Sequence, residues 1–215
     1  MIFSKEEIIF AYTVEKCPKC NKLNRRDFSE GDVLFTPASK CSFCDGIGPM
    51  VVGKMMLHEE KEIISFQTVL AKTTFEQRKL FLLKAEGPSS TVGRPDEALQ
   101  KIIEDGKIDA IIMVDAALKM EGEDSASIAR GFGAAIGGIG TEKFQIEAIA
   151  TRNQIPVFSI IVKQSVKEAI TLMSKEIADQ ADNVRSQVYD MILENTAEGQ
   201  SVVIIGVGNT VGVPQ

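Results

Sequence analysis

Four cysteines are the residues of this chain whose type and spacing most directly indicate chemistry. Cys17 and Cys20 form one C-x2-C pair, and Cys41 and Cys44 form a second pair after twenty further residues. Two such pairs at this separation are typical of a zinc site with four thiolate ligands. Because sulfur would then fill every coordination position, Zn2+ would stabilise the fold and would not bind substrate. Two disulfides are the alternative, although nothing in the sequence indicates secretion.

The cysteines delimit a predicted zinc ribbon over residues 1–44. A turn at 29–32 and a short strand at 33–35 agree with a hairpin between the two pairs. Seven basic and six acidic residues give this ribbon a net charge of +1, whereas the whole chain has −6. The stretch 16–26 contains no acidic residue and five basic ones, Lys16, Lys19, Lys22, Arg25 and Arg26. We expect these side chains either to contact phosphates of RNA or of a ribonucleoprotein or to form a solvated surface.

Two aspartates outside the ribbon are the candidate catalytic residues. Asp115 ends the apolar run 108–115, which is typical of a strand buried on both faces. A carboxylate at such a strand end faces the cleft of an α/β sheet, where desolvation raises its pKa and suits it to proton transfer. Asp45 directly follows the last cysteine. Two other interpretations stay open: Asp45 caps a helix that begins near Pro49, and Asp115 caps a helix or pairs with Lys119.

The loop 86–96 is a candidate anion site. It carries three hydroxyl side chains and an arginine just before a predicted helix, whose unpaired amides and dipole attract anions. We expect this loop either to bind a phosphate or carboxylate group through Ser89, Ser90, Thr91 and Arg94, or to form an ordinary capped helix start.

The elements that must position these residues alternate between strand and helix. The chain of 215 residues is 44% hydrophobic and 25% charged, as expected of a globular protein. Strands are predicted at 63–70, 79–84, 108–115, 156–162 and 201–206, and helices at 49–57, 95–104, 141–152 and, with room for a break, 165–194. This order predicts a three-layer α/β domain over residues 45–215, with a mostly parallel sheet and helices on both faces.

Composition also excludes several classes of protein. No apolar run approaches the roughly 20 residues that cross a bilayer, and the acidic start is unlike a signal peptide, so we expect a cytoplasmic protein without membrane contact. The single histidine excludes most His-dependent triads, and the net charge of −6 argues against a general nucleic-acid coat. The apolar segment 132–140 is a candidate surface for a homo-oligomer.

Residues 45–215 resemble an uncharacterised archaeal family, a domain of unknown function. The similar segments are DGIGPMVVGKMM (45–56), KAEGPSSTVGRPDEA (84–98), IIMVDAALKMEGE (111–123) and VVIIGVGNTVGV (202–213). In that family a longer region without cysteine pairs precedes the first segment, whereas here the predicted ribbon does.

A more distant resemblance is to the spore germination protease and the hydrogenase maturation proteases. They share a phosphorylase/hydrolase-like fold whose first strand ends in a GxGN-like turn, followed by a D-x-x-GP helix start and later by a VDALA-like strand end. Here GVGN stands at 206–209, DGIGP at 45–49 and VDAAL at 114–118, so the first motif comes last. We therefore expect a circularly permuted domain, in which Gln215 lies near Asp45.

The resemblance implies a hydrolase of an amide or peptide bond. Asp45 and Asp115 would form an acidic pair that transfers protons or holds a second, divalent metal ion, and Asn209 would donate an amide hydrogen bond beside them. The alternative is a non-catalytic zinc-ribbon protein that binds RNA, a ribonucleoprotein or a phosphate-bearing ligand. A third alternative is an inactive scaffold that keeps the fold.

Overall fold

The computed structural model of the protein describes residues 46–87, 91–133, 141–169, 173–210 and 213. The predicted ribbon with its four cysteines and its basic stretch lies outside the described residues, as do Asp45, Ser89, Ser90 and Gln215. Among the helices of the described part, none is long and apolar enough to cross a membrane.

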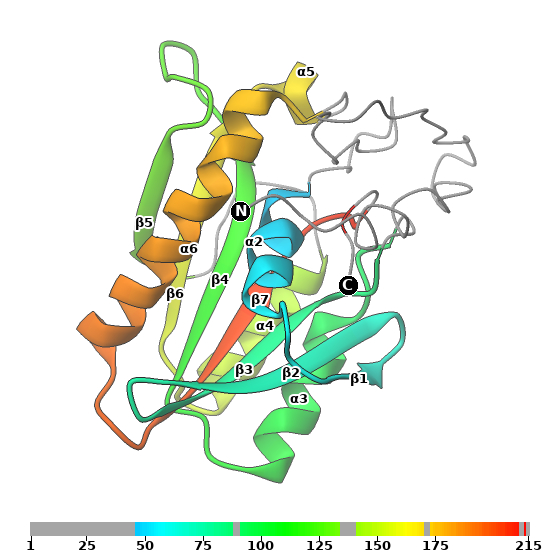
Figure 1. Cartoon of the computed structure of the whole chain (residues 1–215), viewed down its shortest axis with the longest axis vertical. Coiled ribbons are helices and arrows are strands. Elements are labelled where there is room, and N and C mark those ends of the chain that lie inside the picture. Colours follow the sequence, from blue (N-terminus) through cyan, green and yellow to red (C-terminus); the bar gives the residue numbers. More distant parts are fainter. Residues whose placement is uncertain (1–45, 88–90, 134–140, 170–172, 211–212, 214–215) are drawn as a thin grey trace.

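A seven-stranded mixed sheet forms the centre of the described structure, in the order β1-β2-β3-β7-β4-β6-β5 (Figure 1). The strands are β1 (Lys61–Ser65), β2 (Thr68–Phe75), β3 (Arg78–Ala85), β4 (Ala110–Leu118), β5 (Ile128–Phe132), β6 (Val157–Gln164) and β7 (Ser201–Gly206). Strands β3, β7, β4 and β6 are parallel, whereas β1 and β2 on one side and β5 on the other pair antiparallel. The last strand in the sequence is thus the central strand of the sheet.

Helices cover both faces of this sheet, as the alternation of elements predicts (Figure 1). They are α2 (Ile47–Met55), α3 (Pro95–Asp105), α4 (Thr141–Arg152), α5 (Val166–Ala169) and α6 (Lys175–Asn195). On one face, α2 and α6 pack on alternate residues of the parallel strands, such as Ile112 and Ile204. On the other, α3 and α4 pack on the intervening residues, such as Ile111 and Ile205. The continuous apolar runs of β4 and β7 are therefore explained by burial on two sides.

The prediction of a mostly parallel sheet is wrong at its two flanks. The predicted strand 63–70 is divided into β1 and β2 by a tight turn, in which Gln67 has a left-handed φ of 47°. A second tight turn at Glu76–Gln77 joins β2 to β3, and two-residue turns can connect only antiparallel strands. At the opposite flank, the antiparallel strand β5 lies in a part of the chain where no strand is predicted.

Two helix starts, of which only the one at residue 165 is predicted, are stabilised by local hydrogen bonds. Ser165 and Glu168 form a capping box, with Ser165 N donating to Glu168 Oε2 at 2.7 Å and Glu168 N donating to Ser165 Oγ at 3.2 Å. This box begins the short α5, and the helical pattern starts again at α6, where Ser174 Oγ accepts from Ile177 N. The break that the sequence leaves open is therefore present.

Candidate functional site

The carboxyl ends of β7 and β4 mark the point at which the connections of the sheet diverge. The chain leaving β7 turns towards β3, where Thr210 N donates to Thr91 O at 3.0 Å and Thr210 Oγ1 donates to Glu86 O at 2.8 Å. The chain leaving β4 turns towards β6, where Lys119 N donates to Gln164 O at 2.8 Å. Ligands of open α/β sheets bind at such topological switch points, and this edge is therefore the candidate site.

The first turn of α2 lies directly on this switch point. A Cβ added at Gly48 would lie 2.3 Å from both Val114 O and Val207 O, so only glycine allows the helix to approach so closely. Val207 N in turn donates to Val114 O at 2.9 Å, which joins the two strand ends beneath the helix. The α2 start has no side-chain cap and no acidic residue in its first turn.

The segment that follows Asp45 meets the segment that contains Asn209. A Cβ added at Gly46 would lie 3.1 Å from Asn209 O and 3.6 Å from Val213 Cγ2. Asn209 is buried beside this contact. Together with the approach of Gly48 to Val114 O and Val207 O, this contact makes all three segments that carry the predicted site residues adjacent, although Asp45 itself lies outside the described residues.

Asp115 is fully buried near the carboxyl end of β4, three residues before the last strand residue Leu118, on the sheet face that α4 covers. Its Oδ1 accepts from Ala116 N at 2.8 Å, and its Oδ2 forms an ion pair with Lys143 Nζ on the first turn of α4. Oδ2 has no other partner in the described part of the chain. Burial raises the pKa of Asp115 above its ordinary value, against the opposing effect of the Lys143 ammonium. The pair therefore holds a carboxylate whose protonation is easier than that of an exposed aspartate.

Lys84, near the end of β3, is a second buried ionisable residue that the sequence analysis missed. It lies on the α2 face beside Gly206, its partner in the register of β3 and β7, and its side chain has no solvent exposure. Within the described structure its Nζ donates one hydrogen bond, to Ala85 O at 3.0 Å. Burial, assisted by the charge of Lys61, lowers the pKa of Lys84 to about 7. Its position in an alternating strand pattern, in phase with Leu80 and Leu82, is the sequence signal that would have predicted its burial.

The loop predicted to bind anions uses its described polar groups within the protein. Thr91 Oγ1 donates to Gln67 Oε1 at 2.7 Å and accepts from Gly93 N at 3.0 Å. Arg94 forms ion pairs with Asp96 at 3.2 Å and with Glu97 at 3.0 Å. These contacts agree with the interpretation of the loop as a helix start.

The structure describes Asp115 but not Asp45, the other aspartate predicted to hold a second metal ion. No group of three or more His, Cys, Asp or Glu side chains suited to a metal occurs among the residues that the structure describes. At Asp115 itself, the Lys143 ammonium contacts Oδ2. Asp45 and the four cysteines are also predicted to bind metal, and they lie outside the described ranges.

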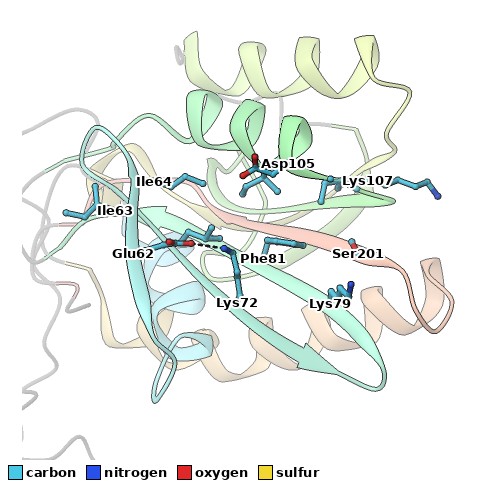
Figure 2. A pocket seen from close by; sticks show the side chains of 13 residues that line it. Glu62, Ile63, Ile64, Lys72, Lys79, Phe81, Asp105, Lys107 and Ser201 are labelled. Atoms are coloured by element: carbon cyan, nitrogen blue, oxygen red, sulfur yellow. Dashed lines mark ion pairs between the residues drawn. The ribbon is translucent and has the colours of Figure 1, made fainter.

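A groove of about 620 Å3 lies at the opposite end of the strands (Figure 2). Its lining includes Lys79 at the start of β3 and Ser201 at the start of β7, so it is separate from Asp115 at the carboxyl end of β4. None of the predicted site residues lines this groove.

Comparison with known proteins adds a family and no activity. A sequence profile of the family described as "Domain of unknown function (DUF1512) C-terminal" matches residues 43–214. A search of curated proteins gives no match.

Proposed function

The chain belongs to the family of the DUF1512 C-terminal domain, and we propose that it is a hydrolase of an amide or peptide bond. The proposed active site is the carboxyl edge of the sheet between β7 and β4. The observation that carries the proposal is the fully buried Asp115, with its raised pKa, at the topological switch point.

Hydrolysis of an amide requires one group that takes a proton from water and another that protonates the leaving amine. We assign these roles to Asp115 and Asp45. The Lys143 ammonium orients Asp115 and balances its charge, while a pKa raised by burial allows the carboxyl group to hold and release a proton. The amide of Asn209 is assigned to the oxygen that becomes negative in the transition state.

The proposed relationship to the germination and maturation proteases gains support from the strand order. If only the parallel strands are counted and β7 is taken as the first of them, then β3, β7 and β4 follow the order second, first, third, with the switch point between the first and third strands. The contact of Gly46 with Asn209 and Val213 brings the two separated half-motifs together. Both are what a circular permutation requires.

The buried Lys84 is a second observation that supports a functional site at the carboxyl edge of the sheet. Among the described residues this buried ammonium has one hydrogen-bond partner, Ala85 O; a buried charge with few partners destabilises the folded state, and such residues cluster at functional sites. Lys84 and Asp115 point to opposite faces of the sheet, so we assign no proton transfer between them.

The test is a search for cleavage with matched variants. The purified chain would be incubated with an unfolded protein and with a mixture of short peptides, and new termini would be identified by mass spectrometry. We expect cleavage that Asp115→Asn and Asp45→Asn each reduce at least a hundredfold, while Asp179→Asn, on the exposed side of α6, leaves it unchanged. Absence of cleavage, or full activity of both folded variants, would refute the proposal.

We also propose that the four cysteines bind one structural zinc ion. This proposal is supported by the spacing of Cys17, Cys20, Cys41 and Cys44. Metal analysis of the purified chain should give one zinc per chain, and Cys41→Ser should reduce this content severely while the α/β domain still unfolds cooperatively. A zinc-free chain with two disulfides would contradict it.

A further inference from the structure

Lys84 is a buried ammonium whose charge has no counterion within the described structure. Its side chain has no solvent exposure, and its Nζ donates to Ala85 O at 3.0 Å. A lysine ammonium has three N–H donors, and neither a second acceptor nor an ion pair of Lys84 occurs among the described residues. Glu86 attracts the ammonium electrostatically but forms no ion pair with it. A buried charge is costly unless an opposite charge and further hydrogen bonds accompany it, so this ammonium lacks an anion.

The start of α2 adds buried backbone donors that have no acceptor. Gly46 is the N-cap of this helix, so the amides of Ile47 and Gly48 have no partner inside the helix. No hydrogen bond of either amide occurs in the part of the chain that the structure describes, and both residues are buried. Unpaired buried amides are rare in folded proteins. Like the Lys84 ammonium, these two amides therefore lack an acceptor.

The ammonium and the two amides belong to the same face and the same edge of the sheet. Lys84 is level with Gly206 in the register of β3 and β7, and a Cβ added at Gly206 would lie 2.5 Å from Gly48 O and 3.0 Å from Pro49 Cα. Lys84 therefore lies beside the first turn of α2, which covers the end of β7 (Figure 1). Its Nζ reaches the carbonyl of Ala85, the last residue of β3, at the edge where α/β sheets bind their ligands.

We propose that Lys84 and the first turn of α2 bind the carboxylate of a ligand, which is either the carboxyl end of a peptide or a small organic acid. The ammonium and the partial positive charge of the helix start both favour an anion, and the first turn contains no acidic residue of its own. Pro49 has no N–H, so this turn offers two amides instead of three. Two amides and one ammonium suit the two oxygens of a carboxylate better than the oxygens of a phosphate group. The inference is independent of the hydrolase proposal, because it makes no use of Asp115.

The test compares small probes on the purified full chain. N-acetylglycine carries a carboxylate, N-acetylglycinamide has the same body without the charge, and inorganic phosphate is an anion with more oxygens. NMR titration of the backbone amides of Ile47 and Gly48 would follow binding. We expect N-acetylglycine to bind about tenfold more tightly than its amide, because the charged hydrogen bonds are lost with the carboxylate, and also more tightly than phosphate. Acetate separates the two sources of the carboxylate: weaker binding than that of N-acetylglycine supports a peptide end, and equal binding supports a small acid.

Substitution of the lysine isolates its contribution. Lys84→Met should weaken N-acetylglycine about tenfold and leave N-acetylglycinamide unchanged, whereas Lys79→Met, at an exposed position of the same strand, should change neither. In the wild type, the Cε resonance of Lys84 should shift when N-acetylglycine is added, which tests the contact without any substitution. No binding of N-acetylglycine, equal binding of the neutral probe, or tighter binding of phosphate would overturn the proposal. Binding that occurs only in Asp45→Asn would also overturn it, because a carboxylate of the chain itself would then occupy these donors.

Discussion

Replacing Lys84 by methionine should stabilise the protein and remove part of its pH dependence. The lysine is fully buried, and its pKa falls from the ordinary value of 10.5 to about 7 in the folded state. Methionine has a similar length and flexibility but no charge, so Lys84→Met keeps most of the packing and removes the ionisable group.

The size of the effect follows from the two pKa values. Each unit of pKa corresponds to about 1.4 kcal/mol, so the interval from 10.5 to about 7 amounts to about 5 kcal/mol. Below pH 7 both the folded and the unfolded chain hold the proton, and the folded state carries the whole penalty. Between pH 7 and 10.5 the unfolded chain binds more protons, so the free energy of unfolding increases with pH. Lys84→Met also removes the hydrogen bond to Ala85 O, which offsets part of this gain. At pH 7 we therefore expect the substitution to raise the free energy of unfolding by about 3 kcal/mol.

The assay is urea unfolding followed by circular dichroism at several values between pH 6.5 and 9. The wild type should gain up to about 1.4 kcal/mol per pH unit from this residue, and Lys84→Met should lack that gain. Lys79→Met replaces an exposed lysine of the same strand and should change the stability by less than about 0.5 kcal/mol. Parallel pH curves for the wild type and Lys84→Met would show that the buried amine has an ordinary pKa.

Three further substitutions test the packing around the site and the flank of the sheet. Gly48→Ala places a methyl group 2.3 Å from two main-chain oxygens and should destabilise by about 3 kcal/mol in thermal unfolding, whereas Gly106→Ala, with nothing within 4 Å, should be nearly neutral. Asp115→Asn leaves the Lys143 ammonium without its anion and should cost about 3 kcal/mol in urea unfolding, most of which Lys143→Met in the same chain should restore. Gln77→Gly should stabilise by about 0.5 kcal/mol in the same assay, because this turn residue has a φ of 61° that glycine adopts without strain.

Much of the fold could be predicted because several elements carry strong local signals. The strand 201–206 is found where the apolar run predicts it, and the helix predicted at 95–104 extends only one residue further. The strand β5 lacked such a signal, since it lies at an edge of the sheet and its residues are largely exposed. The division of 63–70 into two strands depends on the left-handed backbone conformation of Gln67, which a glutamine does not predict.

The candidate site could be predicted only in part. The burial of Asp115 follows from its position in an apolar strand, which continues to Leu118, but the partner Lys143 is distant in sequence and is brought there by packing of α4. Lys84 was missed because a lysine is usually an exposed residue, and its environment becomes clear only with the neighbouring strands in place.

The central position of β7 has a consequence for synthesis of the protein. Strands β3 and β4 each pair with β7 along one edge and do not pair with each other. The two halves of the sheet therefore have no strand to join them until residues 201–206 leave the ribosome. Both halves then present unpaired inner edges with apolar faces, which are prone to aggregation in a partly made chain. A nascent chain stalled before Ser201 should accordingly require chaperones, and completion of the domain should follow the release of its last strand.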